Sequence, residues 1–286
     1  MAHCLGGAMS GDLERAVAHH YSIPDLPERV RKALAAAGLG ADRIAPEALG
    51  PIDEFHIGGR AATVHAVAKM ALASDRHVLD VGCGLGGATR YIAATHGCRV
   101  TGIDLTPDYI TVARILAERT GLADRVTYHV ASALDMPFAD ATFDAAITLH
   151  VAMNIADRAG LYREVARVLK PGAVFCIYDV MKGAREGLRY PVPWADTPAT
   201  SHLETPSAMR ALLAAAGFAV EDVEDRTAFG IAFFRERLAA GTAAPPPPLG
   251  LHLLMGTNTP EKFQNMLAGL EGECICPVVM IARRLG

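Results

Sequence analysis

The sequence predicts an α/β fold built on a doubly wound, mostly parallel sheet. Three observations predict it. Apolar runs rich in β-branched residues recur along the chain, stretches with helical spacing separate them, and a glycine-rich turn follows the first run. This alternation is typical of parallel strands in one layer with helices on both faces, joined by right-handed crossovers.

Seven segments are expected to be strands: residues 77–82, 98–104, 125–132, 143–151, 173–181, 218–227 and 277–284. Helix boundaries are readable between them. Thr106 is a candidate N-cap, Pro107 suits the first helical position, and Gly121 ends that helix. We expect the helix before the fifth strand to end at residues 170–172, Lys-Pro-Gly. Residues 11–38 and 60–73 are expected to be helices that precede the first strand.

Composition excludes several classes of protein. The 286 residues carry a net charge of −4 and no Lys/Arg block, which argues against a nucleic-acid partner. We find no apolar run near the ~20 residues that cross a bilayer and no secretion signal, so we expect a cytoplasmic protein without a membrane span. The six cysteines are scattered, and the one close pair, Cys274 and Cys276, makes a poor metal site. No metal is expected.

The glycine-rich turn contains G-x-G-x-x-G, formed by Gly82, Gly84 and Gly87, and Asp104 ends the next strand. Alone, this pattern suggests a dinucleotide. Two features favour another ligand. Asp80 lies just before the turn, where a carboxylate would repel phosphate but attract a cationic sulfonium and ammonium. In addition, some 76 residues of mainly helical chain precede the first strand.

Four motifs in residues 77–180 carry a family resemblance: VLDVGCGLGGATRYIA, VTGIDLTPDYITVA, LDMPFADATFDAAITLHV and LYREVARVLKPGAVFCIYDV. In this order and spacing they resemble the class I S-adenosylmethionine (SAM)-dependent methyltransferases. The chain is most similar to the small-molecule branch, which holds glycine/sarcosine and dimethylglycine N-methyltransferases and the tocopherol, sterol and quinone methyltransferases. The resemblance implies a seven-stranded Rossmann-like fold with SAM as cofactor.

The resemblance also implies a cofactor site at the carboxyl ends of the strands, formed by Asp80, Gly82, Cys83, Gly84, Asp104, Leu105, Ser132, Ala133 and Leu149. Gly82 and Gly84 would let the backbone approach the methionine part of SAM. Asp104 would accept both ribose hydroxyls, and Leu105 would flank the adenine. Ser132 is a departure, because the family usually has an aspartate there that takes the adenine amino group.

Two histidines are the candidate catalytic residues. His150 leaves the fourth strand where the methyl group would be transferred, and a phenol or protonated amine acceptor needs a base there. The alternative is a histidine that caps the strand end. His56 precedes a Gly-Gly pair in a segment that resembles pocket-closing segments of relatives. Its alternative role is a helix-entry histidine with a local hydrogen bond.

The substrate cover is expected outside the core motifs. We expect residues 1–60 to be an N-terminal helical lid segment and residues 61–286 to be the SAM-binding domain, with cover insertions at about 182–206 and 228–272. Candidate substrate residues are Tyr21, Met153, Tyr178 and Trp194. Aromatic rings could wall a cationic amine through cation–π attraction, and they suit a prenyl chain or flat ring equally well.

The expected function is transfer of a methyl group from SAM to a small-molecule acceptor, with an amine favoured. The first alternative is C- or O-methylation of a lipophilic ring or prenyl substrate. More distant alternatives are an NAD(P)-dependent oxidoreductase and a non-catalytic SAM-binding protein. A small molecule is the expected partner, and a homodimer is left open.

Overall fold

A computed structural model of the chain describes residues 2–40, 43–240, 247–256 and 258–286, with side chains described from residue 11 onward. Its helices are α1 (Ala2–Tyr21), α2 (Leu26–Ala36), α3 (Gly50–Asp53), α4 (Gly59–Ala68), α5 (Gly87–His96), α6 (Pro107–Thr120), α7 (Arg158–Val168), α8 (Pro206–Ala215), α9 (Thr227–Ala240), α10 (His252–Met255) and α11 (Thr259–Glu271). Short 3₁₀ helices are η1 (Pro46–Leu49), η2 (Ala152–Asn154) and η3 (Pro198–Thr200).

All seven expected strands form one sheet in the order β3-β2-β1-β4-β5-β7-β6. They are β1 (His77–Val81), β2 (Arg99–Asp104), β3 (Val126–Val130), β4 (Phe143–Leu149), β5 (Leu169–Lys182), β6 (Phe218–Asp225) and β7 (Ile275–Arg284). Strands β1 to β5 pair in parallel, whereas β7 is antiparallel to both β5 and β6. The fold class predicted from the sequence is confirmed, and the order reverses between β1 and β4.

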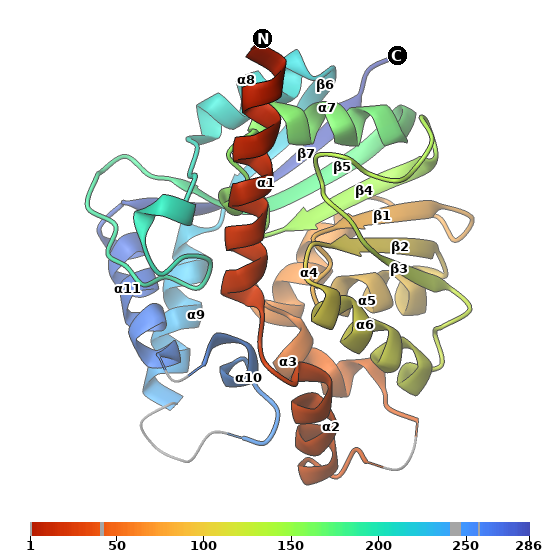
Figure 1. Cartoon of the computed structure of the whole chain (residues 1–286), viewed down its shortest axis with the longest axis vertical. Coiled ribbons are helices and arrows are strands. Elements are labelled where there is room, and N and C mark those ends of the chain that lie inside the picture. Colours follow the sequence, from red (N-terminus) through yellow and green to blue (C-terminus); the bar gives the residue numbers. More distant parts are fainter. Residues whose placement is uncertain (1, 41–42, 241–246, 257) are drawn as a thin grey trace.

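Helices cover both faces of the sheet (Figure 1). Apolar residues of α4, α5, α6, α9 and α11 join one core cluster, and those of α7 and α8 join the cluster on the opposite face. Consecutive residues of β5 alternate between the two clusters: Cys176 belongs to the first and Ile177 to the second. Both faces of the central strands are therefore buried, as continuous apolar strand runs predict.

Three predicted helices differ from the structure, and the first is the stretch 60–73, where α4 already ends at Ala68. Helix α7 ends at Val168, because Leu169 already pairs with Phe143 as the first residue of β5. Residues 170–172 thus lie in the strand rather than at the helix end. The predicted helical stretch 11–38 is two helices, α1 and α2, separated by residues 22–25. Thr106 flanks α6 as predicted, but its side chain makes no capping hydrogen bond.

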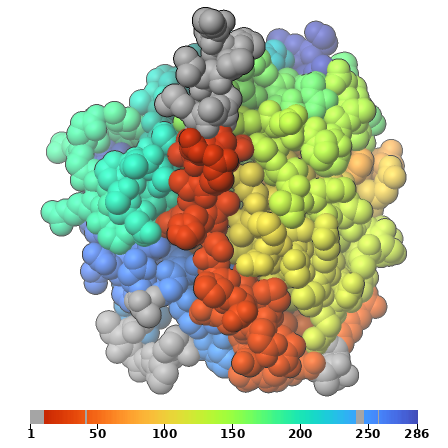
Figure 2. All heavy atoms as spheres, in the orientation of Figure 1, coloured from red at the N-terminus to blue at the C-terminus, as the bar shows by residue number. Residues whose placement is uncertain are grey.

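Helix α1 lies across the carboxyl ends of the strands, between the sheet and the α9–α11 region (Figure 1). In the space-filling view, residues 11–21 (red) are wedged between the 182–215 surface (teal) and the yellow-green surface around residue 130 (Figure 2). None of the described helices is long and apolar enough to traverse a bilayer. Within the described residues, no group of three or more His, Cys, Asp or Glu could hold a metal ion.

Candidate active site

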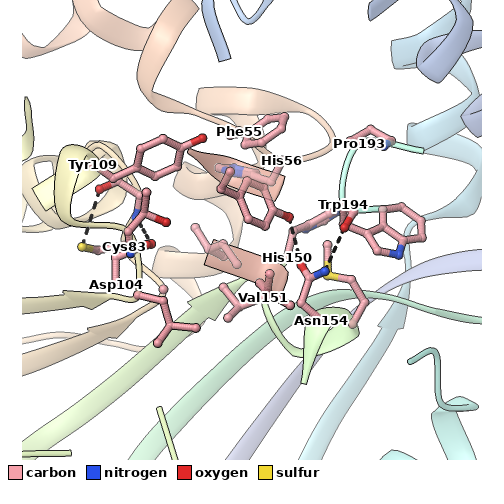
Figure 3. Close-up of a pocket in the computed structure, with 18 of the residues that line it drawn as sticks. Phe55, His56, Cys83, Asp104, Tyr109, His150, Val151, Asn154, Pro193 and Trp194 are labelled. Carbon is pink, nitrogen blue, oxygen red and sulfur yellow. Dashed lines mark hydrogen bonds between the residues drawn. The ribbon is translucent and has the colours of Figure 1, made fainter. Parts of the chain in front are cut away.

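A cavity of about 550 Å³ opens at the carboxyl ends of the strands, where α/β sheets bind ligands. Figure 3 shows Tyr109, Cys83 and Asp104 at one end of it and Pro193, Trp194 and Asn154 at the other. We call these ends the sheet half and the helical half. His56 and His150 lie between them (Figure 3).

Two glycines of the turn after β1 have different roles. Gly82 has φ +72°, and a Cβ there would collide with the side chain of Val151. Gly84 has φ +54° and lines the cavity, but a Cβ there would meet nothing within 4 Å. Gly82 is therefore required by packing, whereas Gly84 leaves open space beside the backbone that a ligand can approach.

Asp104 ends β2 with its carboxylate at the wall of the sheet half. Its Oδ2 accepts a hydrogen bond from the backbone N–H of Gly84 at 3.0 Å, and its Oδ1 accepts from that of Thr106 at 2.9 Å. Burial raises the pKa of this carboxyl, and the two amides oppose the rise. Each oxygen can accept a further bond, so the carboxylate can receive hydroxyl donors from a ligand while it holds the turn.

Asp80 lies within β1, and its carboxylate also lines the cavity. The hydroxyl of Thr89, on α5, donates to Asp80 Oδ2 at 2.6 Å. Burial raises the pKa of Asp80 to about 7, although the Thr89 hydrogen bond opposes the shift. Because a nearby cation would stabilise the ionised carboxylate, Asp80 favours a cationic ligand over a phosphate.

A buried ion pair beneath the turn was not found from the sequence. Arg90 on α5 is fully buried, donates to Asp53 Oδ2 at 2.6 Å, and donates to the carbonyl of Leu85 at 2.7 Å. Asp53 ends α3, and a Cβ on Gly87 would collide with its carbonyl oxygen. The segment before α4 is therefore locked against the glycine turn. Arg60 pairs with Glu54 and does not line the cavity in the described part of the chain.

His56 is held in one tautomer by its neighbours. Its Nε2 lies 3.1 Å from the carbonyl oxygen of Gly59 and 3.0 Å from the hydroxyl of Thr63, which itself donates to Glu54. A carbonyl can only accept, so Nε2 carries the proton. Burial lowers the pKa of His56 to about 4. The neutral ring therefore has its lone pair on Nδ1. The helix-entry hydrogen bond is present, and the residue also lines the cavity.

His150 follows β4 with φ +56°, a conformation that non-glycine residues rarely adopt outside functional sites and turns. Its backbone N–H donates to the carbonyl of Tyr178 at 2.7 Å, which fixes the strand end. Both ring nitrogens are buried and have no hydrogen-bond partner among the described residues. The ring centroid lies 5.9 Å from that of His56, and burial lowers the pKa of His150. Two neutral imidazoles thus converge at the middle of the cavity.

Three of the four expected substrate residues line the cavity. Trp194 is buried and donates from Nε1 to Ser201, and Tyr21 donates from its hydroxyl to Asn154 Oδ1 at 2.9 Å. Met153 lies in η2, also against the cavity. The Asn154 amide donates in turn to the carbonyl of Trp194 at 2.9 Å. Sequence reasoning missed Asn154, which joins α1, η2 and the segment that carries Trp194.

Two expected site residues lie behind the cavity wall: neither Tyr178 nor Ser132 lines the cavity in the described part of the chain. The Tyr178 ring packs edge-on against His150 at 4.6 Å, and its hydroxyl donates to the carbonyl of Ile57 at 3.1 Å. We therefore revise its expected role from substrate contact to support of His150. The hydroxyl of Ser132 donates to the carboxylate of Glu14, on α1. The remaining expected cofactor residues line the cavity, namely Gly82, Cys83, Leu105, Ala133 and Leu149.

The helical half is lined mainly by apolar side chains from α9, α10 and α11, which are Phe233, Phe234, Leu254, Met255, Phe263 and Met266. Phe234 belongs to a core cluster and also lines the cavity. Sequence reasoning also missed Tyr109, although it follows Asp104 by little more than one helical turn. Its buried hydroxyl has no hydrogen-bond partner among the described residues. The described cavity lining includes no Lys or Arg.

Comparison with known proteins agrees with this geometry. The family described as Methyltransferase domain matches residues 79–177. O-methyltransferase resE of Aspergillus sclerotiorum is 39% identical over 113 residues, covering 40% of this chain and 43% of the relative. Sterol 24-C-methyltransferase of Eremothecium gossypii is 39% identical over 111 residues, covering 39% and 30%. These matches support the resemblance to the class I S-adenosylmethionine-dependent methyltransferases. The matched parts of the chain span less than half the length of these two relatives.

Solved structures extend the likeness of the chain to the whole fold. A geranyl diphosphate C-methyltransferase from Streptomyces coelicolor A3(2) superposes with a TM-score of 0.71 at 19% identity, covering 96% of this chain and 98% of that one. The cyclase SpnF superposes with a TM-score of 0.62 at 23% identity, covering 91% and 93%. The fold shared with these structures therefore extends beyond residues 79–177, the segment that the family model matches.

Proposed function

We propose that this chain transfers the methyl group of SAM to a small, lipophilic acceptor that carries no anionic group. The observation that carries the proposal is the two-part cavity: an acidic, open-backbone sheet half meets an apolar helical half, and two neutral histidines stand between them. SAM supplies an electrophilic methyl group on a sulfonium. The chain supplies the orientation and a site shielded from water.

The sheet half fits SAM in two respects. The space beside Gly84 accepts a bulky ligand against bare backbone, and the spare acceptor capacity of Asp104 suits ribose hydroxyls. The charge also fits, because Asp80 and Asp104 line the cavity without a Lys or Arg among its described residues. Asp80, just before the glycine turn, would repel the pyrophosphate of NAD(P), which disfavours the oxidoreductase alternative.

His56 is our candidate for the group that receives the acceptor's proton. Its Nε2–H is committed to Gly59, so the Nδ1 lone pair is available at neutral pH. A hydroxyl or an ammonium acceptor must lose a proton when it gains a methyl group, and a positioned base assists this step. His150 lines the cavity beside His56 and can orient the same acceptor through its unpartnered nitrogens. Tyr178 supports His150 from behind.

The lining of the helical half decides the acceptor class that we propose. Aromatic and aliphatic side chains dominate it, and a carboxylate or phosphate there would lose its hydration without gaining a cation. Arg29 and Lys262 line an adjoining hollow of about 240 Å³, which shares lining residues such as Tyr21 with the cavity, and Lys262 there already lies 3.4 Å from Asp196. Lipophilic hydroxyls, amines or ring carbons fit this lining better than glycine-like amines do.

The test uses SAM with an isotopically labelled methyl group and pairs of acceptors that differ by one carboxylate. Mass spectrometry should detect labelled product with lipophilic alcohols, phenols or amines and none with their carboxylated partners. His56→Gln, measured in parallel, controls for uncatalysed transfer. Labelled product from glycine or sarcosine alone would overturn the acceptor class. Binding of SAM with no product from any acceptor would favour the non-catalytic alternative.

A further inference from the structure

Glu14 on α1 is a cavity-lining carboxylate that neither the family motifs nor the proposed chemistry uses. It comes from the helix that lies across the strand ends, far in sequence from the core motifs (Figures 1 and 2). Leu13, Val17 and Tyr21 line the cavity from the same helix. This face of α1 therefore forms one wall of the site.

The contacts of Glu14 place it at the sheet half. The hydroxyl of Ser132 donates to Glu14 Oε1, and Ser132 Oγ accepts from the backbone N–H of Leu134 at 3.0 Å. Just before Ser132, the N–H of Ala131 donates to the carbonyl of Asp104 at 3.1 Å. The Glu14 carboxylate is thus fixed next to the turn that follows β3. Ser132, which binds it, is the chain neighbour of Ala131, which binds the end of β2 at Asp104.

At this point of the cavity wall, Ser132 and Glu14 offer a ligand a hydrogen-bond acceptor and no donor. Ser132 has one hydroxyl proton and gives it to Glu14, so it cannot donate to a ligand. Glu14 Oε2 takes part in no hydrogen bond among the described residues, and an ionised carboxylate only accepts. A ligand that reaches this point of the wall must therefore present a donor. Adenine presents one through its exocyclic amine.

We propose that Glu14 binds the exocyclic amine of the SAM adenine and that Ser132 orients it for this contact. The inference rests on the proposed function, because it requires SAM in the sheet half. It gives α1 a part in cofactor recognition. The opposite end of the same helical face is fixed by the bond from Tyr21 to Asn154, so α1 touches both halves of the cavity. A carboxylate from α1 then accepts the hydrogen bond from the adenine amine with a charged group, which Ser132 lacks.

The experiment compares two ligands by calorimetry: S-adenosylhomocysteine and S-inosylhomocysteine, in which a carbonyl oxygen replaces the exocyclic amine. The wild-type chain should prefer the adenosyl ligand, since a carboxylate repels the inosyl carbonyl. Glu14→Ala should weaken adenosyl binding about 10- to 100-fold while inosyl binding changes by less than about 3-fold. In Glu14→Gln the side-chain amide can donate to the inosyl carbonyl. The ratio of the two dissociation constants should therefore be closer to one than in the wild-type chain.

Matched variants separate recognition from structure. Asp12→Asn changes an exposed acid of the same helix and should leave both dissociation constants unchanged. Ser132→Asp combined with Glu14→Ala should restore the adenosyl preference, because a carboxylate returns to the same wall. If Glu14→Ala weakens both ligands equally, the residue is structural and the inference fails while the proposed function stands. If neither ligand binds the wild-type chain, the proposed function itself fails.

Discussion

At the scale of single residues, the environment of each polar group decides what it can do. His56 and His150 are both neutral because burial lowers their pKa values, yet only His56 has a neighbour that determines its tautomer. Asp104 and Asp80 are both carboxylates at strand ends. Backbone amides hold the first and a threonine hydroxyl holds the second. The side chains therefore differ in role despite similar positions.

His56 supports a prediction about activity and pH. His56→Gln should lower kcat about 100-fold or more while the dissociation constant of SAM stays within about 3-fold, because a base is lost and the cofactor contacts remain. The wild-type rate should fall on acidification toward pH 4, where the Nδ1 lone pair becomes protonated. Steady-state kinetics across pH and calorimetry with SAM check both parts. An unchanged kcat would remove His56 from the reaction.

The same group should affect the stability of the fold. Its folded pKa is about 4, below the ordinary value of 6.5, so the unfolded chain binds more protons between these values. Stability should therefore rise with pH from about 4 to 6.5, by up to ~3 kcal/mol from this residue. His56→Gln should reduce that slope in urea unfolding measured across the same pH range.

At the scale of elements, one buried ion pair holds the segment before α4 against the glycine turn. Asp53 from α3 and Arg90 from α5 are both fully buried, and the pair closes the underside of the turn. The sequence analysis predicted neither the short helix α3 nor its bond to α5. The two residues are 37 positions apart, so the local spacing of residue types does not predict their contact.

Removal of one partner of this pair should be more harmful than removal of both. Arg90→Met should lower the free energy of unfolding by about 3–5 kcal/mol, because buried Asp53 would lose its hydrogen-bonded counter-ion and keep only Arg60, whose Nη2 lies 3.8 Å from Asp53 Oδ1. Asp53→Asn combined with Arg90→Met should recover part of that loss. Urea unfolding followed by circular dichroism measures both variants. A double variant less stable than Arg90→Met would show that burial of an unpaired charge is not the cause.

At the scale of the whole molecule, ligand binding should be visible as thermal stabilisation. S-adenosylhomocysteine at 100 times its dissociation constant should stabilise the native state by about 2.7 kcal/mol and raise Tm by several degrees, whereas NAD should not. Asp104→Asn should reduce the shift, since the carboxylate is proposed to accept the ribose hydroxyls. Asp108→Asn, outside the described cavity lining, is the control. Stabilisation by NAD alone would contradict the proposed site.

Sequence reasoning did best where a feature depends on residues close together in the chain. The seven strands, the glycine turn and the acid at Asp104 all follow from local patterns of polarity, glycine and strand ends. The end of α7 was misplaced because pairing of Leu169 with Phe143 extends β5 at the expense of the helix. Tyr178 was expected in the substrate site, but its position in β5 directs its ring against His150 instead.

By itself, the sequence determined the sheet, the family resemblance and the strand-end residues that make the sheet half, because apolar periodicity and short motifs encode local backbone geometry. It also predicted Tyr21, Trp194 and a cover insertion at about 228–272, but only the tertiary structure decided which other side chains face the cavity. Long-range packing brings Glu14, Asn154 and the aromatic side chains of α9 and α11 to the site. Local sequence patterns do not predict these contacts, because the segments are far apart in the chain. The charge and shape of the helical half follow from that packing, and the acceptor class that we propose rests on them.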